Sequence, residues 1–238
     1  MSGPRTAAII VAGGTGERLG LPRGKQLAEV EGRPTLTWCL LAFDASELVD
    51  LIIVVCHPER VEEYRRVAVE PYGLTTPIEF AAGGDTRQAS VANGLALVPA
   101  GVTTVLVHDG ARPLVTVELI AETIEALAAD LEADGVIVGH PAIDTLKIVD
   151  GTTIESTPDR ARFWAVQTPQ TFRADALRAA YSAARSDGFL GTDDASLVER
   201  TGGKVLVVEG PRDNIKITVA EDLALVASAL RYRKEHRP

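Results

Sequence analysis

The residues best suited to chemistry directly follow the first apolar run of the chain, in a stretch that reads Ala12-Gly13-Gly14-Thr15-Gly16. Three glycines within four positions remove side chains where backbone N–H groups could surround phosphate oxygens. Two cations, Arg18 and Lys25, follow on the same loop and could neutralise phosphate charge. The pattern favours a phosphate-binding loop at the carboxyl end of a strand, with a plain tight turn as the alternative.

The spacing of these glycines excludes two common phosphate-binding motifs. The dinucleotide fingerprint requires a third glycine three residues after Gly16, and the chain has Leu19 there. The P-loop requires Ser or Thr after its Gly-Lys pair, but Gly24-Lys25 is followed by Gln26. If this loop binds phosphate, it therefore belongs to another class of site.

A second junction between a strand and a helix begins at Gly83-Gly84-Asp85. Asp85 has the residue type and the position of a helix N-cap, and capping would by itself account for it. Ser90 falls on the first turns of the same helix, where it could face a bound ligand. This junction is either a second ligand-binding loop or simply a capped helix start.

Asp109 ends a predicted strand and is followed by Gly110 and then by Arg112. A hard divalent cation such as Mg²⁺ takes one or two carboxylates plus substrate phosphates, so one Asp at a strand end is sufficient to hold it. Pairing of Asp109 with Arg112 in a turn is the alternative. We expect His108 to be structural, because no second His or Cys lies at the spacing of a zinc site.

Two later segments also carry candidate residues. Lys216 lies between Ile215 and Ile217 in a predicted apolar strand, and we expect its ammonium group to point toward a site rather than into the core. Thr192 and Asp193 are predicted to cap the helix that follows them.

The elements that must position these residues alternate along the chain. Predicted strands span 7–12, 51–56, 78–81, 104–108, 135–140 and 204–209. Predicted helices span 35–45, 59–69, 86–98, 117–133, 173–185, 193–201 and 220–231. The strands are apolar almost throughout, which is typical of strands covered on both faces, and the repeated strand–helix order predicts an α/β fold with a mostly parallel sheet.

Residues 144–159 interrupt this alternation. Two short β-rich runs flank Asp150-Gly151, which is a strong signal for a β-hairpin. An arm that projects from the sheet cannot bury both of its faces alone. We therefore expect it to pack on another subunit, with a solvated surface hairpin as the alternative.

Composition limits the class of protein. The chain has 238 residues, 46% of them hydrophobic, and a formal net charge of −9. This suits a folded α/β domain and argues against disorder and against a nucleic-acid partner. Apolar runs are too short to cross a membrane, and the N-terminus lacks the pattern of a secretory signal. We expect a cytoplasmic protein in which Cys39 and Cys56 are reduced core thiols.

Taken together, the motifs resemble those of the 2-C-methyl-D-erythritol 4-phosphate cytidylyltransferases, over nearly the whole chain from Ala12 to Asp222. The matching pieces are the glycine loop with Arg18 and Lys25-Gln26, Gly84-Asp85-x-Arg87-x-x-Ser90, His108-Asp109-x-Ala111-Arg112-Pro113, Asp144-Thr145-x-Lys147, Gln167-Thr168-Pro169-Gln170, Thr192-Asp193-x-Ala195-Ser196 and Asn214-Ile215-Lys216-Ile217-Thr218. Each piece is weak alone, but together in this order they are specific for the family and its near relatives.

The resemblance implies a fold and a reaction. The fold would be the three-layer, Rossmann-like fold of nucleotide-diphospho-sugar transferases, formed by one domain over residues 1–238. The reaction would join CTP to 2-C-methyl-D-erythritol 4-phosphate with a divalent cation, Mg²⁺, and release pyrophosphate. The enzyme would be a homodimer in which the 144–159 arm crosses to the partner subunit.

The resemblance also implies roles for the candidate residues. Arg18 and Lys25 would stabilise the transition state, Arg160 and Lys216 would position the sugar phosphate, and Asp109 would bind Mg²⁺. The nucleotide would contact Ala12, Gly13, Gly14, Thr15, Gly16, Gly84, Asp85, Ser90, Asp109 and Gly110. The acceptor would contact Arg112, Thr145, Arg160, Thr168, Thr192, Lys216 and Thr218, with Thr145 and Arg160 serving the partner's site.

Two other functions stay open at this stage. Ribitol 5-phosphate cytidylyltransferases share much of this pattern, as do other sugar-phosphate nucleotidyltransferases, although Lys147 in Asp144-Thr145-Leu146-Lys147 favours methylerythritol phosphate. A non-catalytic nucleotide-sensing module would bind CTP without releasing pyrophosphate.

Overall fold

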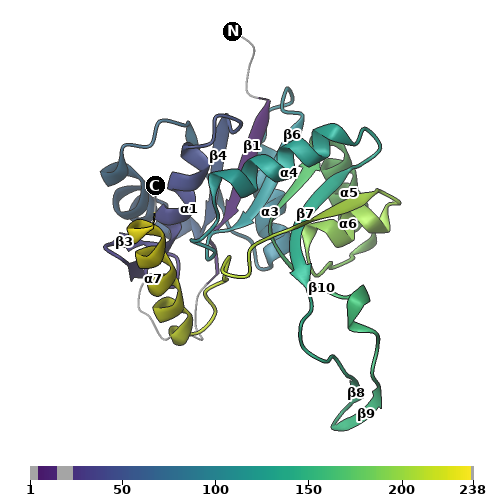
Figure 1. Cartoon of the computed structure of the whole chain (residues 1–238). Helices are drawn as coiled ribbons and strands as arrows, with labels where there is room; N and C mark the ends of the chain where they lie inside the picture. Colours follow the sequence, from purple (N-terminus) through teal and green to yellow (C-terminus); the bar gives the residue numbers. More distant parts are fainter. Residues whose placement is uncertain (1–4, 15–23, 237–238) are drawn as a thin grey trace.

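The computed structural model describes residues 5–14 and 24–236, so the predicted site residues Thr15, Gly16 and Arg18 lie outside the described part of the chain. A seven-stranded sheet forms its centre, in the order β11-β7-β10-β6-β1-β4-β5. The strands are β1 (Thr6–Val11), β4 (Leu51–Cys56), β5 (Ile78–Ala82), β6 (Thr104–Asp109), β7 (Gly135–Pro141), β10 (Trp164–Arg173) and β11 (Val205–Glu209) (Figure 1).

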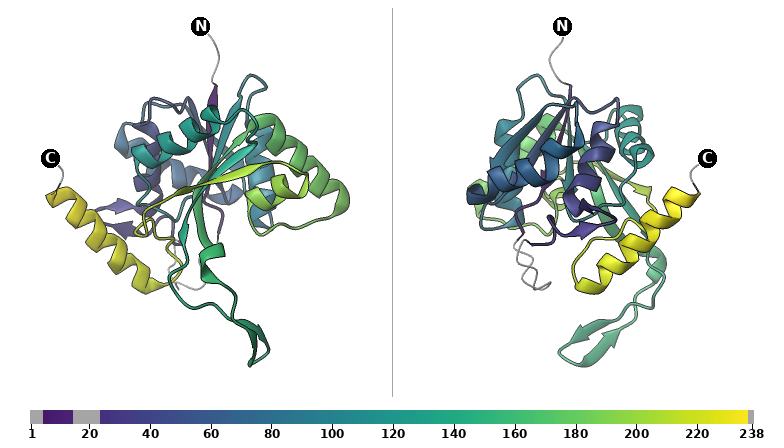
Figure 2. Two further views of the ribbon diagram at one scale, coloured as in Figure 1. Left: turned by 45° about the vertical axis from the view of Figure 1, so that its right-hand side comes forward. Right: turned by 90° about the vertical axis from the view of Figure 1, so that its left-hand side faces the viewer.

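Helices cover both faces of this sheet, which gives the three layers that were predicted (Figures 1 and 2). One face packs on α1 (Thr35–Asp44), α2 (Val61–Tyr64) and α4 (Val117–Ala129). The other packs on α3 (Arg87–Leu97), α5 (Ala174–Asp187) and α6 (Asp194–Arg200). The last helix, α7 (Ala220–Glu235), lies apart from the sheet and packs on the small hairpin formed by β2 (Glu29–Val30) and β3 (Arg33–Pro34).

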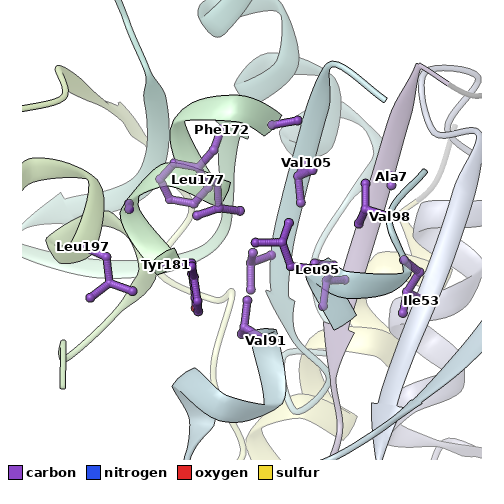
Figure 3. Packing of buried hydrophobic residues seen from close by; sticks show 14 of the residues in the cluster. Ala7, Ile53, Val91, Leu95, Val98, Val105, Phe172, Leu177, Tyr181 and Leu197 are labelled. Carbon is purple, nitrogen blue, oxygen red and sulfur yellow. The ribbon is translucent and has the colours of Figure 1, made fainter. Parts of the chain in front are cut away.

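The apolar strands are buried on both faces because their side chains alternate between the two helical layers. Ile9 and Ile53 belong to the cluster with α3, α5 and α6, whereas Ile10 and Ile52 belong to the cluster on the opposite face. Figure 3 shows the cluster that α3, α5 and α6 form with the sheet, to which Tyr181 of α5 also belongs. The continuous apolar runs of the sequence therefore indicated the core correctly.

Strand β10 is not among the strands predicted from the sequence, where this stretch is noted only for its motif. It runs antiparallel to both β6 and β7, and the neighbouring pairs β1–β4, β1–β6, β4–β5 and β7–β11 are parallel. Its interior is polar, with Gln167, Thr168, Gln170 and Thr171 all buried. Hydrogen bonds offset this burial: Gln170 Nε2 donates to Asp193 Oδ2 at 2.8 Å, and Thr171 Oγ1 lies 2.7 Å from Thr123 Oγ1.

Several predicted helices have different bounds, and the last of them, 220–231, extends to Glu235. The predicted helix 59–69 is broken into a 3₁₀ turn at Pro58–Arg60, then α2, a π-type turn at Arg65–Val69 and a second 3₁₀ turn at Glu70–Tyr72. The predicted helix 117–133 ends at Ala129, because the carboxylate of Asp130 accepts hydrogen bonds from the backbone N–H groups of Glu132 and Ala133. Such a local side-chain turn competes with helix continuation.

The predicted arm is present as a β-hairpin. Strands β8 (Ile148–Asp150) and β9 (Thr153–Ser156) pair antiparallel, and Gly151 between them has φ +56°, which favours glycine. Figures 1 and 2 show the hairpin projecting well away from the sheet, beyond the end of β10. The hairpin prediction from Asp150-Gly151 is confirmed.

The packing of α3 on the sheet depends on Gly94. A Cβ atom at this position would lie 2.7 Å from Cγ2 of Ile9 and 2.9 Å from Cγ2 of Val55, both on stiff β-branched side chains. We expect Gly94→Ala to lower the free energy of unfolding by about 1–3 kcal/mol through overpacking, despite the better helix propensity of Ala. Urea unfolding measures this change.

The matched control is Gly101→Ala, because no atom lies within 4 Å of a Cβ built at Gly101. Its stability should stay within about 0.5 kcal/mol of the parent, as for most surface substitutions. Equal stability of the two variants would contradict the close approach of α3 to β1 and β4.

Candidate active site

The two glycine loops meet at the carboxyl edge of the parallel strands. Gly13 follows β1 and Gly83 follows β5; a Cβ atom at Gly13 would lie 3.7 Å from Cα of Gly83 and 3.8 Å from Oγ of Ser90. The backbone N–H of Gly83 donates to Cys56 O at 2.7 Å, which fixes its loop to the end of β4. In open α/β sheets, ligands bind at this edge, so the structure brings both predicted loops to the expected place.

The second loop is held differently from the prediction. Thr86, not Asp85, is the N-cap of α3: its side chain accepts from the backbone N–H of Ala89 at 3.0 Å. Ser90 is buried, and its hydroxyl accepts from Gly84 N at 3.0 Å and donates to Thr86 O at 2.9 Å. Asp85 is left exposed on the loop, free of a capping role, and Ser90 shapes the loop from beneath.

Gly84 is required by this packing. A Cβ atom there would lie 2.6 Å from Cβ of Ala89 and 3.1 Å from its carbonyl carbon. No rotamer relieves such an overlap, so the loop can approach α3 only with glycine at this position.

Lys25 lies against the first glycine loop. Its Cε would be 3.9 Å from a Cβ atom at Gly14, and Nε2 of Gln26 would be 3.5 Å from the same point. Lys25 also helps to hold the pKa of Asp222 below its usual range, together with hydrogen bonds from Val219 and Thr218 that overcome the effect of burial. The side chain of Lys25 therefore lies beside the backbone of Gly14, and its charge acts on the carboxylate of Asp222.

Asp109 is the centre of a buried cluster of charges at the end of β6. Nζ of Lys216 lies 2.7 Å from its Oδ2, Nε of Arg87 lies 3.1 Å from its Oδ1, and Nε of Arg112 lies 3.9 Å from Oδ2. Burial alone would raise the pKa of Asp109, but Arg87 and then Lys216 hold it well below its usual range. Asp109 is therefore ionised, and the ammonium group of Lys216 points toward this carboxylate rather than into the core.

The sequence predicts a strand around Lys216, and this prediction is wrong. Lys216 lies in an irregular segment between β11 and α7. Backbone N–H of Ile217 donates to Ala111 O at 2.8 Å, and Nη1 of Arg112 donates to Asn214 O at 2.7 Å. These bonds tie the segment to the loop after β6. The apolar neighbours of Lys216 serve the small core under α7 rather than the sheet.

Two residues in this cluster were missed by the sequence analysis. Nη1 of Arg87 lies 2.8 Å from Oδ2 of Asp194, and the hydroxyl of Tyr181 donates to Oδ1 of the same carboxylate. Arg87 belongs to a matched motif but has no predicted function there. Asp194 lies beside the predicted capping residue Asp193 and is itself not among the predicted site residues. A charged residue at the start of each of two helices was the only signal that the sequence offered.

His108 and Thr168 form a hydrogen-bonded pair that holds the backbone of Asp109 in place. The hydroxyl of Thr168 accepts from the backbone N–H of Asp109 at 3.0 Å and lies 3.1 Å from Nδ1 of His108. Nε2 of His108 lies 3.2 Å from Arg112 O, and because a carbonyl only accepts, we assign the proton to Nε2. Thr168 is thus buried, and its hydroxyl contacts both Asp109 and His108.

The remaining predicted residues lie on other segments. Gly110 packs tightly, since its Cβ would lie 3.1 Å from Cδ1 of Leu36, and Ala12 is buried after β1. Thr192 is exposed just before Asp193, which caps α6 as predicted. Thr218 donates through its backbone N–H and its hydroxyl to Asp222 Oδ2, at 2.7 and 2.8 Å.

Thr145 and Arg160 are not brought to this cluster within one chain. Thr145 is exposed on the arm, and Nη1 of Arg160 donates to the carbonyl of Ile143 at the base of the arm, at 2.8 Å. Figure 1 shows the hairpin well below the sheet.

Within residues 5–14 and 24–236, no group of three or more His, Cys, Asp or Glu side chains could hold a metal ion by itself. Nor is any described helix long and apolar enough to cross a membrane. A cation at Asp109 would need further ligands from a bound substrate, which is the usual arrangement for Mg²⁺ with phosphates.

The three layers, the glycine loop after β1 and the ionised Asp109 among cations together define a Rossmann-like nucleotidyltransferase. Residues 6–232 match the family model for 2-C-methyl-D-erythritol 4-phosphate cytidylyltransferase. The chain belongs to this family, and the family predicted from its motifs is confirmed.

Individual relatives agree over nearly the full chain. The 2-C-methyl-D-erythritol 4-phosphate cytidylyltransferase of Geotalea uraniireducens is 42% identical over 98% of this chain and 100% of its own length. The crystal structure of 4-diphosphocytidyl-2C-methyl-D-erythritol synthase from Anaerococcus prevotii has a TM-score of 0.83 at 32% identity, covering 95% of this chain and 96% of its own. The cytidylyltransferase structure from Thermus thermophilus has a TM-score of 0.75 at 34% identity, covering 94% and 98%.

The buried state of His108 gives a prediction on stability. Burial is the main reason that the pKa of His108 is lowered to about 4, whereas an unfolded His titrates near 6.5. At pH values between these two pKa values, His108 is protonated in the unfolded chain but neutral in the folded chain. The free energy of unfolding therefore falls as the pH falls. We expect the His108 contribution to cost roughly 2 kcal/mol at pH 5 relative to pH 7.5.

The comparison that isolates this contribution is urea unfolding of the parent and of His108→Gln at both pH values. The variant is expected to be less stable at pH 7.5 but to lose roughly 2 kcal/mol less on acidification. The same loss in both proteins would show that His108 is not the buried neutral group described above.

Proposed function

We propose that this chain transfers the CMP group of CTP to 2-C-methyl-D-erythritol 4-phosphate, a step in the non-mevalonate supply of isoprenoid precursors. The products would be 4-CDP-2-C-methyl-D-erythritol and pyrophosphate. The observation that carries the proposal is the ionised Asp109, held among Arg87, Lys216 and Arg112 at the edge where both glycine loops meet. Membership of the full-length family supports the same reaction.

The reaction requires charge neutralisation rather than a general base. A phosphate monoester has a second pKa near 6 and is largely dianionic at neutral pH, so it can attack directly. One acceptor phosphate oxygen forms a bond to the α-phosphorus, the bond from that phosphorus to the oxygen bridging to the β-phosphate breaks, and pyrophosphate leaves. Repulsion between the dianion and the triphosphate is the main obstacle.

The chain's own residues address that obstacle. Gly14 would offer backbone N–H groups to the triphosphate, with Lys25 beside it, and Arg18 would contribute from the same loop. Gly84, Asp85 and Ser90 would form the edge around the nucleoside. Lys216 would meet the acceptor phosphate, because its side chain is 36% exposed and its ammonium group is held at the strand end by Asp109.

A divalent cation, Mg²⁺, is part of the proposal. Asp109 fits such a cation because it is a hard, ionised oxygen donor at the strand end, and the triphosphate would supply the further oxygens. Bound there, the cation would offset triphosphate charge. Oδ2, which contacts Lys216, is the oxygen that can become available to it.

We further propose that the enzyme is a single-domain homodimer joined through the arm. Apolar side chains on the arm have no layer behind them: Val149 is 55% exposed and Ile154 is 59% exposed, with Phe163 and Trp164 also exposed at the base. Such a patch is typical of an interface. Crossing of the arm would bring Thr145 and Arg160 to the partner's acceptor site.

The setting proposed for this enzyme is the cytoplasm, with no nucleic-acid or membrane partner. Cys39 and Cys56 are both buried free thiols, which suits a reducing compartment. The net charge of −9 disfavours binding to a nucleic-acid backbone.

The direct test is pyrophosphate release with CTP, UTP or ATP and with methylerythritol phosphate or ribitol 5-phosphate as acceptor. We expect turnover with CTP and methylerythritol phosphate, dependent on Mg²⁺ and abolished by a chelator. Preference for ribitol 5-phosphate would overturn the acceptor assignment, and CTP binding without pyrophosphate release would overturn the reaction. Lys25→Ala should lower kcat at least about a hundredfold, since such cations contribute roughly 3 kcal/mol.

The crossed arm predicts complementation between two inactive variants. Arg160→Ala and Lys25→Ala homodimers should each be nearly inactive. After subunit exchange, each heterodimer would hold one site with both lesions and one site with neither, so activity should recover to about a quarter of the parental value at random exchange. Absence of recovery, in a mixture shown by mass spectrometry to contain heterodimers, would mean that Arg160 serves its own chain.

A further inference from the structure

The guanidinium group of Arg87 bridges two carboxylates from different elements. It extends from the first turn of α3, with Nε 3.1 Å from Oδ1 of Asp109 and Nη1 2.8 Å from Oδ2 of Asp194. Asp109 ends β6 and Asp194 begins α6. Because the donors of a guanidinium are fixed in one plane, Arg87 sets the distance and orientation of one carboxylate relative to the other.

Asp194 is the immobile end of this bridge. Its residue is 1% exposed, and its other oxygen accepts from the hydroxyl of Tyr181 on α5. A buried carboxylate that lost these partners would bear a large desolvation cost, so Asp194 cannot turn away from Arg87 without destabilising the fold. Although burial alone would lower it, Asp194 and then Asp109 raise the pKa of Arg87, which stays charged.

Asp109 is the functional end, and its two oxygens are held unequally. Oδ1 contacts Arg87, which is itself held at its far side by Asp194. Oδ2 contacts Lys216, whose side chain is 36% exposed on an irregular segment, and lies 3.9 Å from Nε of the more buried Arg112. The contact between Oδ2 and Lys216 can be exchanged without disturbing the buried ion pair of Arg87 with Asp194.

We propose that Arg87, anchored by Asp194 and Tyr181, is a positioning residue that fixes the orientation of Asp109 and occupies its Oδ1, so that Oδ2 alone is offered to the divalent cation. The inference rests on the proposed function in one respect, namely that Asp109 serves a nucleotide-bound cation.

A neighbouring residue separates this role from simple packing. Gln88 follows Arg87 on the same turn and ties α3 to the segment before Asp194: its Nε2 donates to Phe189 O at 3.0 Å, and its Oε1 accepts from Gly191 N at 2.9 Å. Gln88 therefore ties α3 to the segment that leads into Asp194, but its two hydrogen bonds go to Phe189 and Gly191 and not to Asp109. This makes Gln88→Ala the matched control.

The experiment measures Mn²⁺ affinity by electron paramagnetic resonance, in the presence of CTP and without an acceptor, so that no turnover occurs. Arg87→Lys keeps the charge but loses the two-sided fork, and Asp194→Asn keeps the size but loses the charged anchor. We expect the Mn²⁺ dissociation constant to rise at least about tenfold in Arg87→Lys and at least about threefold in Asp194→Asn, since each tenfold step is about 1.4 kcal/mol. Gln88→Ala should stay within about twofold of the parent.

Each result has a defined meaning. Parental Mn²⁺ affinity in Arg87→Lys, or equal weakening in Gln88→Ala, would overturn the positioning role and leave only packing. If Arg87→Lys does not fold, Asp194→Asn decides the question, and parental affinity in that variant overturns the proposal. Failure of the parent itself to bind Mn²⁺ with CTP would contradict the proposed function as well, which distinguishes the two failures.

Discussion

The site depends on keeping one carboxylate ionised inside the protein. Burial would favour the neutral form of Asp109, and the arrangement of Arg87, Lys216 and Arg112 reverses this preference. These cations come from α3, from the segment before α7 and from the loop after β6, so three separate parts of the chain must fold before the carboxylate is stable. The chemistry and the tertiary structure are thereby linked, because loosening any of these parts changes the charge at the strand end.

The antiparallel strand β10 supplies the other half of the support. It lies between β6 and β7, and it places the Thr168 hydroxyl against the backbone N–H of Asp109. Its polar interior also holds neighbouring segments: Asn214 Nδ2 donates to Gln167 Oε1 at 3.0 Å, and Gln170 reaches the capping residue Asp193. A strand of apolar residues at this place would fill the sheet but could not hold the Lys216 segment or the start of α6.

These interactions explain where sequence reasoning succeeded and where it failed. Strands such as β4 are apolar on both faces, so composition alone indicates them, and glycine loops at their ends follow from the fold class. Strand β10 could not be recognised in the same way, because hydrogen bonds rather than apolar contacts offset its burial. The Arg87–Asp194 pair joins residues more than one hundred positions apart, and Thr86 rather than Asp85 caps α3; both depend on distances that no local pattern contains.

The overall charge of the chain and the charge of its site have opposite signs. A protein with net charge −9 would repel anionic substrates if its charges acted together. At physiological ionic strength, however, the Debye length is about 8 Å, so acidic residues on the far surface are largely screened from the site. Near Asp109 the balance is set locally, because Arg87, Arg112 and Lys216 exceed Asp109 and Asp194 by one positive charge. An anion is therefore attracted to this edge of the sheet by the few charges that the fold places there.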